Sequence, residues 1–317
     1  MKKNIAILIG GKSAEKDISK KSGVNFYTNL NTKKYSGYLI LVSEKSWKVI
    51  NTESPKKIEK KDFSFEKSGK KIMFDAVIIL IHGAPGETGE LCNYFESIKI
   101  PYSSSNEKAS KLTFDKYTCN DFLRTKGYSV PYSTKNKKRN IHIKYPCIVK
   151  PINSGSSFGV SKIDSENKLN EAIKLAQQYS KDFMIEEFVK GRELTCAVHN
   201  FSNNKIETLP ITEIISKNEI FDYKAKYLGQ SEEITPAKIE KNIEKEISII
   251  SKNAYKTLKL NGIVRFDFII KKSTPYIIEV NTIPGFSKES IVPQMIVASG
   301  KSVKKFISEA VEKIISN

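Results

Sequence analysis

The sequence predicts an α/β protein whose first part is an open, parallel α/β sheet. Asn4–Ile9 and Phe74–Ile81 are continuous apolar runs, the pattern of strands that are covered on both faces. Each run ends in a glycine-rich turn and is followed by a helical stretch, Ala14–Leu30 after the first and Glu90–Ile98 after the second. Because ligands on such sheets bind at the carboxyl ends of the strands, both turns mark the place of an expected site.

The rest of the chain continues as helices and strands separated by polar loops. Leu169, Ala172, Ile173 and Ala176 recur at helical spacing, which indicates an amphipathic helix. A proline near the first turn favours a helix start at Thr235-Pro236. The expected helices cover Thr113–Gly127, Asp164–Ser180 and the stretch from Thr235 onward; a polar loop covers Phe221–Thr235; strands cover Cys147–Lys150, Phe183–Glu187, Glu193–Val198, Ile263–Ile270 and Pro275–Val280.

Length and charge limit the class of protein. At roughly 100–200 residues per domain, 317 residues indicate two or three domains. The net charge of +18 could indicate a nucleic-acid partner, but only four of the 53 basic residues are arginine. The lysines are scattered along the whole chain, which is typical of a solvated surface. We therefore expect no nucleic-acid partner.

Cysteine usage and hydropathy favour a cytoplasmic protein. Four widely spaced cysteines form no CxxC pair, which indicates buried free thiols in a reducing compartment and no zinc or redox motif. The first apolar run is too short for a signal peptide, and no run reaches membrane-spanning length. We expect no insertion into a membrane.

The strongest chemical signal lies in the two late strands. Alternation with period two places Arg265 and Asp267 on one face of the first strand, and Glu279 and Asn281 share a face of the second. Carboxylate and amide oxygens suit Mg²⁺, which shares its coordination sphere with phosphates. An arginine beside them suits a carboxylate or a developing oxyanion. A solvated sheet face is the less favoured alternative.

Two middle segments and one turn add weaker signals. Lys150 ends a strand that leads into a serine- and glycine-rich loop reaching Gly159, which could wrap a phosphate or be an ordinary surface loop. Glu186–Val189 closes an apolar strand whose backbone could bind an adenine edge, with Glu193 on ribose hydroxyls. His82, at the end of an apolar strand, could donate a hydrogen bond to developing charge.

Taken together, these motifs resemble the D-alanine–D-alanine ligases of the ATP-grasp superfamily. The resemblance runs over nearly the whole chain and keeps the order of the motifs. The motifs are Gly10-Gly11-Lys12-Ser13-Ala14-Glu15, His82-Gly83-Ala84-Pro85-Gly86-Glu87, Val149-Lys150-Pro151, Gly155-Ser156-Ser157-Phe158-Gly159, Phe221-Asp222-Tyr223-Lys224-Ala225-Lys226-Tyr227, Arg265-Phe266-Asp267 and Glu279-Val280-Asn281-Thr282-Ile283-Pro284-Gly285.

The resemblance implies a role for each matched position. For the nucleotide, Lys116, Lys150 and Lys226 would contact phosphates with Ser157 nearby, Glu186, Glu187, Phe188 and Val189 would form the adenine hinge, and Glu193 would take the ribose. For the metal, Asp267, Glu279 and Asn281 would ligate two Mg²⁺ or Mn²⁺ ions. For the amino acids, Glu15, Ile18 and His82 would hold the first D-alanine, and Ser290 and Ile291 would hold the second. Arg265 and the Gly285 N–H would form an oxyanion site. Tyr227 would close a lid by hydrogen bonding to Ser156 and Glu15.

The resemblance also implies an organisation and a reaction. The α/β sheet of residues 1–101 would bind substrate, and a two-part ATP-grasp fold would follow as residues 102–190 and 191–317. The enzyme would ligate two D-alanines through an acyl phosphate for peptidoglycan precursor synthesis, and would act as a cytoplasmic homodimer. Departures from the usual family pattern put the packing of the first-substrate turn in doubt, at Thr88, Cys92, Asn93 and Ser103–Ser105.

Three alternatives stay open at this stage. The nearest is a related ligase that makes D-alanyl-D-lactate or D-alanyl-D-serine, although Tyr227 favours D-alanine within the family. A lysine-rich nucleic-acid-binding protein would show steeply salt-dependent binding. A catalytically dead relative would have lost a metal ligand or a lysine, and no such loss is visible in the sequence.

Overall fold

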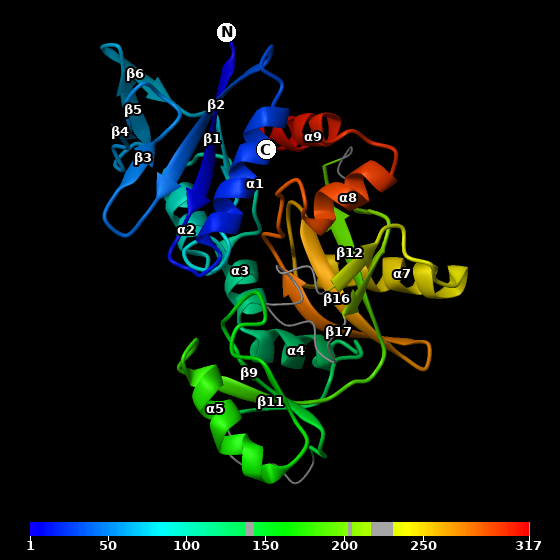
Figure 1. Cartoon of the computed structure of the whole chain (residues 1–317). Helices are drawn as coiled ribbons and strands as arrows, with labels where there is room; N and C mark the ends of the chain where they lie inside the picture. Colours follow the sequence, from blue (N-terminus) through cyan, green and yellow to red (C-terminus); the bar gives the residue numbers. More distant parts are fainter. Residues whose placement is uncertain (137–142, 202–204, 217–230, 317) are drawn as a thin grey trace.

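The computed structural model of the chain is built around three larger β-sheets (Figure 1). It describes residues 1–136, 143–201, 205–216 and 231–316. A two-stranded hairpin, β5 (Ser64–Lys67) and β6 (Lys70–Met73), stands beside the first sheet. No helix in these described ranges combines the length and apolar character that crossing a membrane requires.

The first sheet is parallel at its centre and antiparallel at one edge. Strand β1 runs parallel to both β2 and β7, as the sequence predicts, but β2–β3 and β3–β4 are antiparallel pairs. The reason is the short Ser43–Ser46 turn, because a parallel return would need a long crossover connection. The strands, in sheet order, are β4 (Lys56–Lys57), β3 (Trp47–Val49), β2 (Tyr35–Val42), β1 (Lys3–Gly10) and β7 (Ala76–Ile79).

Helices cover both faces of this sheet, and one of them comes from the far end of the sequence. Alternate residues of β1 face opposite sides: Ile5, Ile7 and Ile9 join a core with α1 (Lys16–Asn29) and α9 (Val303–Ile315). The other face packs on α2 (Glu90–Ser97). Figure 1 shows α9 beside α1. Burying each large aliphatic side chain contributes roughly 1.5–3 kcal/mol, so residues about 300 apart in sequence stabilise one layer.

The second sheet is antiparallel and carries one covering helix. Its core is the apolar side of α5 (Leu169–Gln177), which follows a short 3-10 turn at Glu166–Lys168. The helix therefore occupies only part of the expected Asp164–Ser180 range. The strands, in sheet order, are β10 (Ser161–Ile163), β9 (Cys147–Pro151), β11 (Phe183–Glu187) and β8 (Ser133–Lys135).

The third sheet contains the two late strands. They pair as an antiparallel hairpin next to β12, and α7 (Lys241–Thr257) packs against the sheet through Ile243, Ile247 and Ala254. Helix α8 (Ile291–Ala298) follows the hairpin. The strands are β15 (Ser231–Ile234), β14 (Thr212–Ser216), β12 (Arg192–His199), β16 (Val264–Lys271) and β17 (Thr274–Asn281), with β13 (Glu207–Thr208) paired to β12.

Two predicted helices differ from the structure. The stretch Thr113–Gly127 is two helices, α3 (Glu107–Phe114) and α4 (Lys116–Thr125), because Asp115 takes an extended backbone and caps α4 through the Thr118 N–H. The predicted helix start at Thr235-Pro236 is wrong. The Ala237 N–H instead donates to the Ile211 carbonyl, and α7 begins at Lys241.

The structure describes only part of the expected loop Phe221–Thr235. Its last part, Ser231–Ile234, forms strand β15, which pairs with β14, so the loop prediction is wrong for these residues. Residues 221–230 lie outside the described residues. The domain borders near residues 101 and 190 stay predictions.

The cysteines and the serine departures have ordinary packing roles. All four cysteines are buried and free, as expected. The Ile79 N–H donates to the Ser103 hydroxyl, and Ser105 exchanges hydrogen bonds with the backbone of Asn261. The serines thus join the first sheet to the start of the late hairpin.

His199 gives the fold a testable pH dependence. The ring is 1 % exposed, lies between Phe201 and Phe306, and accepts a hydrogen bond from the Phe201 N–H at Nδ1. Burial lowers the pKa of His199 to about 4. The unfolded chain, with an ordinary histidine pKa of about 6.5, therefore binds more protons between these values, and acidification over this window destabilises the fold.

We predict that His199→Asn, which keeps an acceptor, removes part of this dependence. Denaturant titrations of both proteins at several pH values give the two slopes of unfolding free energy against pH. Between about pH 6.5 and pH 4, the free energy of unfolding of the wild type should fall by at most about 3 kcal/mol more than that of the variant. Parallel slopes in the two proteins would contradict the assignment.

Candidate active site

The late hairpin brings its four polar residues together on one face. Strands β16 and β17 pair Asp267 with Glu279 and Arg265 with Asn281. The Arg265 guanidinium forms a two-pronged contact with the Asp267 carboxylate at 2.7 and 2.8 Å, and Asn281 donates to it at 2.9 Å. From β12, the buried Thr195 hydroxyl donates to the same carboxylate at 2.7 Å. Asp267 is therefore held from three directions while Phe266 and Phe268 fill the core behind it.

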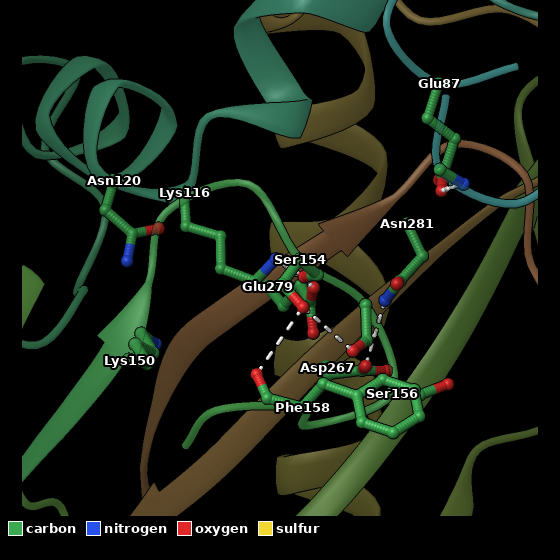
Figure 2. A network of polar contacts seen from close by, with 12 residues as sticks. Glu87, Lys116, Asn120, Lys150, Ser154, Ser156, Phe158, Asp267, Glu279 and Asn281 are labelled. Carbon is green, nitrogen blue, oxygen red and sulfur yellow. Dashed lines mark hydrogen bonds and ion pairs between the residues drawn. The ribbon is translucent and has the colours of Figure 1, made fainter. Parts of the chain in front are cut away.

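Lys116 connects the hairpin to the middle of the chain. Figure 2 shows its side chain extending from the start of α4 toward Glu279. The ammonium lies 2.9 Å from the Glu279 carboxylate and also donates to the Ser154 carbonyl. Burial lowers the pKa of Lys116, but the neighbouring Glu279 carboxylate outweighs burial, so the pKa lies above its ordinary value. The lysine is a fixed positive charge at this point.

A second buried ion pair lies on the middle sheet. Lys150 on β9 and Glu186 on β11 are directly joined at 2.7 Å, and both side chains are almost inaccessible to water. Burial raises the pKa of Glu186, and the Lys150 charge opposes this effect. The Glu186 side chain thus orients the lysine, in addition to any role of its backbone at the strand end.

Glu15 directly precedes α1 and meets the loop that follows β9. The Ser156 hydroxyl donates to the Glu15 carboxylate. A Cβ at Gly155 would overlap the Glu15 carboxylate, so a larger residue there would displace that side chain. Ser156 and Ser157 have positive φ values of 50° and 57°, which side chains rarely adopt, so the loop is held in an unusual shape beside Glu15.

His82 is buried at the carboxyl end of the β7 strand, as expected. Its Nδ1 lies 2.8 Å from the Ile283 carbonyl and therefore carries the proton of the neutral ring. Burial lowers the pKa of His82, which favours that neutral form. Nε2 is then an acceptor, and within the described part of the chain it has no hydrogen-bond partner. A donor role for this nitrogen would require the protonated ring.

Two cavities contain these groups. One, here called the loop cavity, has a volume of about 340 Å³ and is lined by Glu15, Ile18, His82, Ser156, Arg265, Asn281, Gly285, Ser290 and Ile291. The other, the sheet cavity, has a volume of about 610 Å³ and is lined by Lys150, Ser157, Glu186, Glu187, Phe188, Val189, Glu193 and Asp267.

The two cavities adjoin. Lys116, Ser154 and Glu279 line both of them, so the ion pair between Lys116 and Glu279 forms part of the common boundary. Every site residue predicted from the sequence that lies in the described ranges lines one cavity or both. The two remaining predicted site residues, Lys226 and Tyr227, lie outside the described residues.

Three groups of the site, the buried Thr195 and the partly buried Glu87 and Glu233, received no role from the sequence. Glu87 and Glu233 line the loop cavity, and Thr195 supports Asp267 from β12. Glu87 belongs to the glycine turn after β7, so its motif was visible although its function was not. Glu233 is held by Gln294 at 2.7 Å, and neither it nor Thr195 stands in a recognisable pattern of the sequence.

The donor set fits a hard divalent cation beside a phosphate. Asp267, Glu279 and Asn281 supply two carboxylates and one amide oxygen, and in this structure arginine and lysine balance the two negative charges. Mg²⁺ commonly binds through one or two carboxylates and completes its sphere with water and phosphate oxygens. The residues are therefore compatible with such an ion.

Comparisons with known proteins agree with this geometry. Models of the D-ala D-ala ligase N-terminus and C-terminus match residues 4–105 and 120–312. Relatives named D-alanine–D-alanine ligase include one from Azobacteroides pseudotrichonymphae, 41% identical over 98% of this chain and 100% of its own length. Another, from Flavobacterium johnsoniae, is 41% identical over 98% of each chain.

Solved structures give the same result. The VanG D-Ala:D-Ser ligase from Enterococcus faecalis has a TM-score of 0.87 at 28% identity, covering 98% of this chain and 99% of its own. A D-alanine–D-alanine ligase from Bacillus anthracis in complex with ATP has a TM-score of 0.78 at 25% identity, covering 99% of this chain and 97% of its own. With both family models matched in order and full-length relatives above 40% identity, the chain belongs to the D-alanine–D-alanine ligase family.

Proposed function

We propose that this chain ligates two D-alanines into D-alanyl-D-alanine and converts one ATP to ADP and phosphate. The observation that carries the proposal is the pair of adjoining cavities with Lys116 and Glu279 on their common boundary. A nucleotide in the sheet cavity can present its last phosphate at that boundary, where a carboxylate in the loop cavity would meet it. The two reactants are thereby held next to each other, which is a large part of catalysis.

The sheet cavity is assigned to ATP. The adenine edge is assigned to the backbone of Glu186–Val189, and the ribose hydroxyls to Glu193. Lys116 and Lys150 are assigned to the phosphates, where buried positive charge is most effective. Ser157 contributes from the loop after β9, and Lys226, outside the described residues, is proposed as a third phosphate contact.

Asp267, Glu279 and Asn281 are assigned to two Mg²⁺ or Mn²⁺ ions. Such ions neutralise charge on the transferring phosphoryl group. The chain's own contribution is to fix the ligands: Thr195 and Arg265 hold Asp267, and Lys116 holds Glu279. These contacts set the carboxylates in place before a nucleotide arrives.

The loop cavity is assigned to the two amino acids. Glu15 is suited to the first ammonium, since its carboxylate faces the cavity at the start of α1. His82 is placed near the first carboxylate, and Ile18 packs beside the substrate. Ser290 precedes α8 and Ile291 is its first residue, and the N–H groups at a helix N-terminus favour the second carboxylate.

The reaction follows from this placement. An oxygen of the first D-alanine's carboxylate attacks the γ-phosphorus, ADP leaves, and an acyl phosphate forms. The amine of the second D-alanine attacks the acyl carbon and gives a tetrahedral intermediate, whose oxyanion is assigned to Arg265 and the Gly285 N–H. Phosphate leaves with the bonding pair, and the amine loses its proton. Exclusion of water protects the acyl phosphate, which is the role proposed for a lid carrying Tyr227 against Ser156 and Glu15.

A D-alanyl-D-serine ligase is the second candidate, because the VanG enzyme shares the fold at a TM-score of 0.87. Its 28% identity is lower than the 41% of relatives named D-alanine–D-alanine ligase, so D-alanine is the proposed second substrate. A cytoplasmic location, a part in peptidoglycan precursor synthesis and a homodimer stay predictions that follow from the family.

The first test is the product itself. The purified chain with ATP and Mg²⁺ should release phosphate only when D-alanine is added, and mass spectrometry should find D-alanyl-D-alanine. Parallel reactions containing D-alanine with D-serine or D-lactate identify the second substrate by product mass. Absence of any dipeptide between about pH 6 and pH 9 would refute the enzyme assignment.

The second test is Arg265→Ala. Loss of one oxyanion donor should lower kcat by about 10²–10³-fold, because the group acts on charge that develops in the transition state. Steady-state kinetics measure the change, and Lys126→Ala, at the exposed C-terminal end of α4, is the control. A kcat near that of the control would refute the assigned role.

A further inference from the structure

Glu87 joins two segments that lie far apart in sequence. One carboxylate oxygen accepts from the Gly83 N–H at 2.8 Å, and the other accepts from the Ile283 N–H at 3.3 Å, 196 positions away. The side chain lines the loop cavity, and Figure 2 labels it among the polar network. Its two contacts therefore connect the turn after β7 to the segment after β17.

The backbone of Ile283 is held at its N–H and at its carbonyl by this turn. Its N–H donates to Glu87, and its carbonyl accepts from His82 Nδ1 at 2.8 Å. The Ile283 side chain is buried in the core of the first sheet. Three contacts thus fix the residue Ile283, and the two hydrogen bonds come from the turn on the side of the site assigned to the first amino acid.

The turn that carries Glu87 has little freedom. The Glu87 N–H donates to the Gly83 carbonyl at 2.8 Å, and a Cβ on Gly86 would overlap the backbone oxygen of Ile81. Burial raises the pKa of the Glu87 carboxyl to about 7, and the nearby Glu15 and Glu279 add to this rise. A partly buried carboxyl group loses part of its hydration, and the two N–H groups that it accepts from replace that loss.

Ile283 lies midway between two residues with assigned chemistry. Asn281 is two positions before it, and the Gly285 N–H is two positions after it. A shift of the Ile283 peptide therefore displaces the amide oxygen and the oxyanion donor together. Displacements of about 1 Å at such groups reduce rates by about 10²-fold.

We infer that Glu87 is a positioning residue, which aligns the Asn281–Gly285 segment with the first-substrate turn and so sets the oxyanion site for the tetrahedral intermediate. The inference deepens the proposed function and rests on it. It predicts a selective effect, in which binding of the tetrahedral state weakens while nucleotide binding in the sheet cavity does not.

The test compares Glu87→Gln with Glu90→Gln, the same change at an exposed carboxylate of the neighbouring helix. An amide has one acceptor oxygen and can satisfy only one of the two N–H groups. We expect kcat to fall by about 10²-fold and the affinity for a phosphinate dipeptide, a tetrahedral analogue, to fall by a similar factor. The Kd of ADP should stay within about twofold of wild type, as should all values for the control.

Two further measurements keep the outcomes separate. Glu87→Asp, one methylene shorter, should reproduce the loss with the charge retained, and melting temperatures identify any variant that does not fold. A kcat and phosphinate affinity equal to the control, or equal losses for ADP and phosphinate in a folded variant, would overturn the inference. The wild-type product in the same assay decides the proposed function, whereas the variant-to-control ratio decides the role of Glu87.

Discussion

The site depends on opposite charges that are held in pairs at the edge of a buried strand hairpin. Asp267 and Glu279 lie side by side on β16 and β17, and two such carboxylates repel each other in a poorly solvated place. Arg265 and Lys116 counter that repulsion from opposite directions. The fold thereby keeps two acids close together on neighbouring strands.

Strand alternation explains why this part of the site was predictable. Phe266 and Phe268 must face the core, which leaves Arg265 and Asp267 no choice but the opposite face. The same reasoning failed where position depends on distant contacts. Nothing local in the sequence shows that Glu87 reaches Ile283, because that contact depends on how two separate segments approach each other.

The predictions of the fold that were wrong have similar physical causes. Asp115 divides a continuous helical pattern because its side chain caps the following helix better than its backbone continues the preceding one. Pro236 suits a helix start by itself, but the Ala237 N–H is taken by Ile211 in a neighbouring strand connection. The antiparallel edge of the first sheet follows from a short turn. Each case is a tertiary contact or a cap that overrides a correct local preference.

The packing of α9 on α1 and β7 has a consequence for how the protein is made. Ile78 of β7 is translated long before Phe306 and Ile307 of α9, which belong to the same buried core. Because ribosomes add roughly 5–20 residues per second, the chain between β7 and α9 takes many seconds to synthesise. The first sheet therefore cannot complete this core until α9 has been translated.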